Sequence, residues 1–209
     1  MTSLAIIDYG MGNLFSIARA VERAGFSPTI TGDADEVRKA DAVLLPGVGA
    51  FGDAIADLAR ASLDEALRER VAAGRPLIGV CLGLQLLFET SEEFGSHKGL
   101  GLIKGRVKRL PRGLLKVPSV GWCQVNKRAA AQGTPLDQLP DGAWQYFVHS
   151  YVVEPEDETV IASDTAFGDL AFCSAVAQGA IFACQFHPER SGDQGLAVYE
   201  ALPGWMGSL

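Results

Sequence analysis

The chain has 209 residues, of which 48% are hydrophobic and 21% charged, as is usual for a globular domain with a buried core. Its net charge of −7 disfavours an electrostatic nucleic-acid binder, and no apolar run approaches the ~20 residues that a membrane helix needs. The start of the chain lacks the basic residues and long apolar stretch of a signal peptide, and the four cysteines lack zinc-ligand spacing. We therefore expect one cytoplasmic domain, residues 1–209, with no metal site, membrane segment or nucleic-acid partner.

Strand-like and helix-like patterns alternate over the first ninety residues. Short apolar runs predict strands at residues 4–9, 29–31, 41–46 and 76–80. Helical spacing of apolar residues predicts helices at residues 14–24, around 36–39, at 53–73, and from Cys81 to about Glu93. Strands alternating with helices in this way indicate βαβ units around a mostly parallel sheet.

The second half of the chain is dominated by strand patterns separated by Gly, Pro and Asp. Strands are predicted at residues 102–110, 122–125, 145–153 and 159–163. Two more, at 171–177 and 180–186, flank Gln178-Gly179, which predicts a tight hairpin. A helical pattern resumes over residues 191–201. The fold class is therefore α/β, with a mostly parallel central sheet flanked by helices and an added antiparallel section.

Cys81 occupies a pattern that is typical of a catalytic nucleophile. It lies between Gly79 and Gly83, at the junction of a predicted strand and a predicted helix. The glycines let the backbone turn sharply and let another main chain approach, and the helix N-terminus favours the thiolate. A lone cysteine is more often a small core residue, and we expect this of Cys173 and Cys184. The setting of Cys81 instead predicts a nucleophile.

A cysteine nucleophile needs a base, and the chain has three histidines. His97 is predicted in a solvated loop and His149 in the core. His187 directly follows a predicted strand, as Cys81 does, and active groups of open α/β sheets gather beyond the carboxyl ends of the strands. Glu189 lies two residues further on, beyond a proline. It either holds the imidazole in one tautomer, completing a triad, or is a surface carboxylate.

Two glycine-rich segments follow predicted strands. Residues 46–52 lack the Gly-Lys-Ser/Thr ending of a phosphate loop, so their N–H groups are better suited to a developing oxyanion beside the nucleophile. Residues 10–13 resemble the start of a dinucleotide fingerprint, but Phe15 occupies its third glycine position. We therefore expect no dinucleotide site there.

Several of these motifs together resemble a known enzyme family. Gly-Val-Cys-Leu-Gly-Leu-Gln at 79–85 and Phe-His-Pro-Glu at 186–189 are similar to class I (triad) glutamine amidotransferases. Further motifs resemble, within this family, the glutaminase subunits of imidazole glycerol phosphate synthases of histidine biosynthesis: residues 8–13, 46–49, 86–89, 98–102 and 146–151. The resemblance runs from about residue 4 to residue 201. It implies a flavodoxin-like fold and neither a metal nor an organic cofactor.

The resemblance also implies an activity and the residues that perform it. L-glutamine is hydrolysed to glutamate and ammonia through a glutamyl thioester, with Cys81 attacking, His187 protonating the departing ammonia and Glu189 orienting His187. The implied oxyanion donors are Gly47, Val48, Gly49 and Leu82. The implied glutamine-binding residues are Gln85, Glu93 and, through their backbone, Ser150 and Tyr151.

Ammonia would be lost in water, so such a subunit is expected to dock onto the enzyme that uses it. In the family this partner is a (β/α)₈-barrel cyclase, which makes imidazole glycerol phosphate and aminoimidazole carboxamide ribotide and stimulates the glutaminase when its nucleotide ligand binds. Asn13, Tyr146 and Arg190 match interface positions of relatives, which often have lysine in place of Arg190. Relatives usually have histidine and asparagine where this chain has Ser119 and Cys123, which puts partner recognition around that segment in question.

Three other functions compete with this interpretation. A paralogous amidotransferase, feeding ammonia to a different acceptor such as a surface-sugar amidating enzyme, would have the same triad. Only the departures at Ser119 and Cys123 favour it. A stand-alone cysteine hydrolase, acting on peptides or γ-glutamyl compounds, would need no partner. A non-catalytic binding subunit would be expected to have lost a triad residue, and all three are present.

Overall fold

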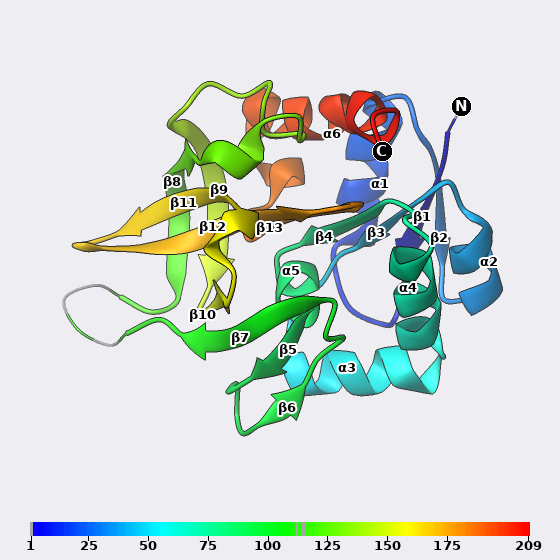
Figure 1. Cartoon of the computed structure of the whole chain (residues 1–209), viewed down its shortest axis with the longest axis horizontal. Coiled ribbons are helices and arrows are strands. Elements are labelled where there is room, and N and C mark those ends of the chain that lie inside the picture. The colour runs from blue at the N-terminus through cyan, green and yellow to red at the C-terminus, as the bar shows by residue number, and fades with distance from the viewer. Residues whose placement is uncertain (1, 112, 114–115) are drawn as a thin grey trace.

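A single extended sheet organises the chain (Figure 1). In the computed structural model, which describes residues 2–111, 113 and 116–209, thirteen strands are joined by hydrogen bonds. Five adjacent strands form a parallel centre, in the order β2 (Ser27–Thr31), β1 (Ser3–Ile7), β3 (Ala42–Leu45), β4 (Leu77–Val80) and β13 (Ile181–Cys184). The inner strands are short apolar runs because both faces of this centre are covered.

The helices cover the two faces of the parallel centre in two groups. The first face carries α1 (Leu14–Arg23) and α6 (Gly192–Met206), and the second carries α2 (Ala34–Lys39), α3 (Phe51–Arg60), α4 (Leu63–Ala72) and α5 (Leu82–Leu86). Figure 1 shows α1 and α6 above the sheet, with α3 and α4 below it. Side chains of β1 alternate accordingly, because Leu4 and Ile6 join one core whereas Ala5 and Ile7 join the other.

The remaining strands form the antiparallel section. From β13 outward run β12 (Leu170–Gln178), β10 (Tyr151–Pro155), β7 (Ile103–Arg109), β5 (Phe88–Ser91) and β6 (His97–Lys98), of which only the β7–β5 pair is parallel. β11 (Ile161–Phe167) pairs with β12 and with β8 (Ser119–Lys127), which pairs with β9 (Ala143–His149). Short 3₁₀ turns lie at Ala129–Ala131, Glu158–Val160 and Pro188–Arg190.

The sequence prediction of an α/β fold with a parallel centre and an added antiparallel section is confirmed. Helices and strands alternate through the first half, and α6 occupies the predicted C-terminal helix. The predicted hairpin at Gln178-Gly179 is also confirmed, because Gln178 pairs with Ile181 and Gly179 has a φ of +55°. None of the helices in the described part of the chain is long and apolar enough to cross a membrane.

The single helix predicted over residues 53–73 is wrong. The structure has two helices, because Ser62 adopts a left-handed conformation with φ 54° between α3 and α4. The buried residues of α3 end at Leu58 and those of α4 begin at Leu63, which is not helical spacing. The break therefore lets both helices turn their apolar stripe toward the same face of the sheet.

The long helix predicted from Cys81 to about Glu93 is also wrong. α5 ends at Leu86, and the chain enters β5 at Phe88, which pairs with Ile103 of β7. The residues from Leu84 to Phe88 are buried on all sides, so this segment lacks the polar face of a surface helix. A short apolar run of this kind is compatible with either a helix or a strand, and the neighbouring strand decides it here.

Two strand predictions of the second half need smaller corrections. The strand predicted over residues 145–153 is split at Ser150 into β9 and β10, because β9 pairs with β8 whereas β10 pairs with β7 and β12. The strand predicted over residues 159–163 begins only at Ile161, after a 3₁₀ turn. Different partners on either side of Ser150 are tertiary information that the local pattern does not contain.

Candidate active site

Cys81 lies at a sharp turn between β4 and α5. Its backbone has φ 56° and ψ −110°, a conformation that non-glycine residues rarely adopt and that clusters at functional sites. The N–H of Cys81 donates to the carbonyl of Cys184 at 2.8 Å, which fixes the turn against β13. The residue is 6% exposed, so its sulfur lies at the edge of the core. This geometry is that of a nucleophile elbow.

The two glycines around Cys81 are required by close packing. A Cβ atom on Gly83 would lie 1.9 Å from the carbonyl oxygen of Leu45, in the neighbouring strand β3. A Cβ atom on Gly79 would lie 2.9 Å from the Cβ of Ala183 in β13. Both distances are far below van der Waals contact, so only glycine lets the elbow lie against these two strands.

His187 and Glu189 form a buried pair directly after β13. Nδ1 of His187 lies 2.8 Å from Oε1 of Glu189, and the two side chains are only 7% and 2% exposed. The hydroxyl of Tyr199, from α6, donates to Oε2 of Glu189 at 3.4 Å. The carboxylate therefore accepts a hydrogen bond from Nδ1–H of His187, and Nε2 has no hydrogen-bond partner among the described residues.

The electrostatics favour a charged imidazole. Burial lowers the pKa of His187, but interaction with Cys81 and Glu189 outweighs burial and raises this pKa to about 10. The raised pKa of His187 therefore depends on its two neighbours, Cys81 and Glu189. Such an imidazolium next to the sulfur is the arrangement that activates a cysteine nucleophile.

The backbone of His187 is held by β9. Its N–H donates to the carbonyl of Tyr146 at 2.9 Å, and its carbonyl accepts from the hydroxyl of Ser191 at 2.6 Å. The same hydroxyl oxygen accepts from the N–H of Tyr146 at 2.9 Å. Two hydrogen bonds thus fasten the segment that carries the histidine to Tyr146, and the third joins Ser191 to His187 within that segment.

A cavity of about 290 Å³ opens beside Cys81. The residues that line it come from the loop after β3, the elbow and α5, the segment after β5, the residue before β8, and the junction of β9 and β10: Val48, Gly49, Cys81, Leu82, Gln85, Glu93, Pro118, Val148, His149, Ser150 and Tyr151. Most of the oxyanion and glutamine-binding residues that the resemblance implied thus surround one space. Gly47 adjoins it, since a Cβ atom there would lie 2.3 Å from the hydroxyl of Tyr9 and 3.0 Å from the Cβ of Leu82.

Glu93 has a structural contact as well as a place in the cavity wall. Its Oε2 accepts from the N–H of Phe51 at 2.6 Å, at the first residue of α3. A carboxylate at this end of a helix is stabilised by the unpaired N–H groups and the helix dipole. Glu93 therefore joins the wall of the cavity to the start of α3.

A chain of side-chain amides, which the sequence did not indicate, reaches the sulfur. Nε2 of Gln85 donates to the carbonyl of Tyr151 at 3.0 Å and to Oε1 of Gln185 at 2.9 Å. Nε2 of Gln185 in turn donates to Sγ of Cys81 at 3.6 Å. Gln185 lies inside the strand predicted over residues 180–186, and its position two residues before His187 is the only sequence signal that could have identified it.

The other two histidines have distinct places. His149 lies in the core as predicted, between Phe147 and Phe172, but it also lines the cavity. Burial lowers its pKa to about 4, against the opposing effect of its hydrogen bond to the Tyr151 carbonyl, so the ring is neutral. The solvated loop predicted for His97 is wrong, because His97 is half-buried in β6 with its ring against Gly52 of α3.

The predicted interface residues lie at the surface. Asn13 caps α1, and its Oδ1 accepts from the N–H of Ser16 at 3.4 Å. The guanidinium carbon of Arg190 lies 4.2 Å from the ring centroid of Tyr146, a cation–π contact. The Tyr146 ring also meets the edge of Trp122, with a centroid distance of 6.2 Å. Tyr146, Arg190 and Trp122 therefore form one aromatic and cationic cluster.

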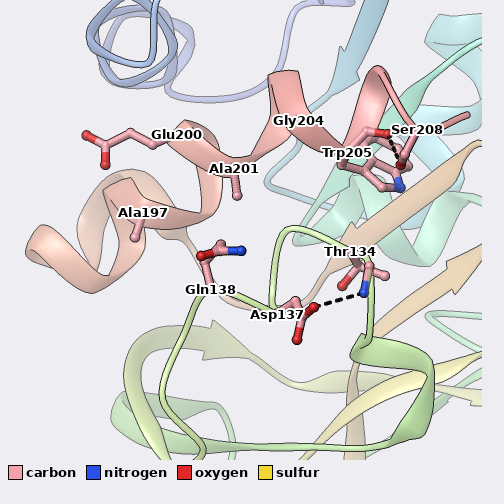
Figure 2. Close-up of a pocket in the computed structure, with 10 residues that line it drawn as sticks. Thr134, Asp137, Gln138, Ala197, Glu200, Ala201, Gly204, Trp205 and Ser208 are labelled. Carbon is pink, nitrogen blue, oxygen red and sulfur yellow. Dashed lines mark hydrogen bonds between the residues drawn. The ribbon is translucent and has the colours of Figure 1, made fainter.

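Cys173 and Cys184 are buried core residues, as predicted, and burial raises the pKa of both thiols. In the described part of the chain no group of three or more His, Cys, Asp or Glu side chains is arranged to hold a metal ion. A larger cavity of about 580 Å³ lies elsewhere, between α6 and residues 133–138 (Figure 2). Its wall contains none of the predicted site residues.

Known proteins resemble this chain along nearly its whole length. A model of the family described as glutamine amidotransferase class-I matches residues 5–200. Imidazole glycerol phosphate synthase subunit HisH of Moorella thermoacetica is 49% identical over 198 residues, covering 95% of this chain and 92% of the relative. The HisH subunits of Dehalococcoides mccartyi (strain CBDB1) and Aquifex aeolicus are 46% and 45% identical, covering 94% and 93% of this chain and the same shares of the relatives.

Solved structures agree in fold. The crystal structure of a glutamine amidotransferase has a TM-score of 0.75 at 20% identity, covering 97% of this chain and 98% of that chain. PurLQS of Thermotoga maritima has a TM-score of 0.76 at 18% identity, covering 99% and 98%. The sequence relatives carry the assignment further than these distant structures. This chain belongs to the class I glutamine amidotransferase family, and within it resembles the HisH subunits of imidazole glycerol phosphate synthase.

Proposed function

We propose that the chain, acting as one domain over residues 1–209, hydrolyses L-glutamine to glutamate and ammonia and passes the ammonia to a (β/α)₈-barrel cyclase. The cyclase uses it to make imidazole glycerol phosphate and aminoimidazole carboxamide ribotide in histidine biosynthesis, in the cytoplasm. The observation that carries the proposal is the buried His187–Glu189 pair next to Cys81, which lines a cavity. The high identity to HisH subunits along nearly the whole chain supports the choice of pathway.

The reaction begins when the Cys81 thiolate attacks the side-chain amide carbon of glutamine in the cavity. The C–S bond forms, and the amide oxygen becomes an oxyanion, which accepts hydrogen bonds from backbone N–H groups around Gly49 and Leu82, since both residues line the cavity next to the sulfur. His187 gives its proton from Nε2 to the amide nitrogen, the C–N bond breaks, and ammonia leaves. The product of this half is a glutamyl thioester and neutral His187.

Hydrolysis of the thioester restores the enzyme. His187 takes a proton from water, the hydroxide adds to the thioester carbon, and the C–S bond breaks to release glutamate and the Cys81 thiolate. Glu189 stabilises the imidazolium in both halves through Nδ1. The proton needed for the first step of the next cycle is then again on His187, consistent with its pKa of about 10.

The outer face of the β8–β9 pair supports docking of a partner. Val120, Trp122 and Trp144 are exposed on this face, and Trp122 and Trp144 leave 50% and 51% of their area accessible. Tyr146 and Arg190 lie next to these residues and extend the outer face. Exposed tryptophans with an arginine are the residues that dominate binding energy at protein interfaces. An independent hydrolase would have no use for such a face.

The geometry of β8 also bears on the paralogous alternative. Ser119 is buried, and Cys123 packs against the core, because alternate residues of a strand point to opposite faces. The outward residues between and beside them are Val120 and Trp122. The two departures from the family pattern therefore lie beneath the outer face and favour a changed packing contact over a changed partner.

Coupling to the cyclase is the test of the proposed function. Glutamate release by the purified chain is measured alone and with a barrel cyclase of histidine biosynthesis plus its nucleotide ligand. We expect the complete mixture to raise the rate by 5–150-fold or more, roughly the range of allosteric coupling between two sites. Equal rates with and without the cyclase would contradict the proposal and indicate a stand-alone hydrolase. A response only to a different acceptor enzyme would support the paralogous alternative.

Truncation of Trp122 is expected to weaken cyclase binding. A buried interface tryptophan is worth about 2 kcal/mol or more, so Trp122→Ala should raise the Kd by roughly 30-fold. The Kd of each variant for the cyclase is measured by titration calorimetry. Leu170→Ala is the matched control, since Leu170 is 56% exposed on β12 and not on the β8–β9 face. Equal affinities of the two variants would place the interface elsewhere.

A further inference from the structure

We propose that Gln185 is a further catalytic residue, whose side-chain amide donates an N–H···S hydrogen bond that stabilises the Cys81 thiolate. The inference rests on the proposed function only in taking Cys81 as the nucleophile. The resemblance assigned no role to Gln185, and the pattern around it suggested only the end of an apolar strand.

The position of Gln185 is fixed by its surroundings. It directly follows β13, and its N–H donates to the carbonyl of Ser174 in β12 at 2.8 Å. The residue is completely buried, and Nε2 lies 3.6 Å from Sγ of Cys81. A buried amide without hydrogen-bond partners would destabilise the fold, so both the oxygen and the NH₂ group of Gln185 are expected to form hydrogen bonds.

The orientation of the amide follows from one backbone carbonyl. The carbonyl of Tyr151 can only accept, so the end of Gln85 that faces it at 3.0 Å must be the NH₂ group. The same NH₂ group lies 2.9 Å from the Gln185 side chain, whose facing atom must then be the oxygen. Gln185 consequently turns its own NH₂ group toward the sulfur. Neither amide can flip without breaking a hydrogen bond.

A donor at this position acts on the charged form of the sulfur. Hydrogen bonds to ionised acceptors are stronger than those to neutral ones, and a donor to the charged form lowers the pKa of an acid. The titratable groups that act on Cys81 from the packed elements are His187 and Cys184 around β13 and Tyr9 after β1. Of these only His187 favours the thiolate, since Tyr9 and Cys184 repel it when charged. Gln185 supplies a second favourable contact, which is neutral and independent of pH.

Gln185→Met removes the donor and keeps a side chain of similar length. The rate of Cys81 alkylation by iodoacetamide is measured against pH on the purified full chain, with Cys81 followed by mass spectrometry of its peptide. We expect the midpoint of this profile to rise by about one pH unit, which means about tenfold less thiolate at a fixed pH below it. The kcat for glutamine should fall at neutral pH and recover toward higher pH, which a purely structural role would not produce.

Gln145→Met is the matched control, because Gln145 is also completely buried but lies in β9, opposite Cys123. Its profile should match that of the unaltered chain. Should Gln185→Met fail to fold, Gln185→Glu keeps the shape, places a carboxyl group beside the sulfur, and is expected to raise the midpoint at least as far.

An unchanged alkylation midpoint in a folded Gln185 variant would overturn the inference, whatever the activity. Failure of the proposed function is a separate result: glutaminase activity that persists in Cys81→Ala. Alkylation reports on the thiol without requiring glutamine or the cyclase, so the two failures are distinguishable.

Discussion

Cys81→Ala is expected to abolish glutamine hydrolysis, lowering kcat by at least about a thousandfold. The variant keeps His187, Glu189 and the cavity, but none of these groups can form the thioester that divides the amide hydrolysis into two steps. Water would have to attack glutamine directly, with only the remaining donors to stabilise the oxyanion. Glutamate release is measured in the presence of the cyclase and its ligand, where the proposed function expects the intact chain to be most active.

Controls must show that the loss of activity comes from removing the nucleophile and not from misfolding or from the loss of any cysteine. Cys123→Ser is the control, because Cys123 is a half-buried cysteine outside the cavity and should keep most of the activity. Cys81→Ala should still bind the cyclase with unchanged Kd, which shows that it is folded. Retained activity in Cys81→Ala would remove the cysteine from the mechanism and with it the proposed chemistry.

Gly83→Ala is expected to destabilise the fold by more than about 4 kcal/mol, at the far end of the range for single substitutions. The new Cβ atom would lie 1.9 Å from the carbonyl oxygen of Leu45. This oxygen cannot move away freely, because Leu45 is in β3, which is paired with β4 directly before the elbow. Relief of this clash requires separating α5 from the sheet. The loss in the free energy of unfolding is measured by urea unfolding.

The matched control is Gly204→Ala in α6. A Cβ atom on Gly204 would have no neighbour within 4 Å, so the substitution should stabilise the helix by about 0.5–1 kcal/mol. The opposite signs of the two effects separate the close approach at the elbow from the general preference of helices for alanine. A Gly83→Ala variant that loses less than about 1 kcal/mol would show that the elbow can relax.

The sequence predicted best where function and local geometry coincide. Gly79 and Gly83 favour a nucleophile over a core residue at Cys81, because glycines at both positions are costly unless the backbone needs them. His187 and Glu189 are two residues apart, so their pairing is local as well. The alternation of strands and helices in the first half is a strong periodic signal, and it gave the parallel centre of the sheet correctly.

The predictions that were wrong or missed depend on contacts between parts of the chain that are distant in sequence. Helix breaks at Ser62 and after Leu86, and the strand break at Ser150, are set by which element packs on which, and the local pattern is silent on this. Gln185 was missed for the same reason. Its partners Gln85 and Cys81 are 100 and 104 residues away, so only the folded chain reveals the contact.

Ser119 and Cys123 support a different conclusion in the structure than in the sequence. In the sequence they are departures from a family pattern near a presumed contact region, and they favour a different partner. In the structure both side chains point inward from β8, so they leave the outer face unaltered.

The attachment of His187 to Tyr146 has a mechanical consequence. The side chain of Tyr146 belongs to the outer face, whereas its N–H and carbonyl, with the Ser191 hydroxyl, hold the main chain of the base. A protein that docked on the outer face would therefore bear on the strand whose main chain is hydrogen-bonded to His187, without any molecule entering the cavity.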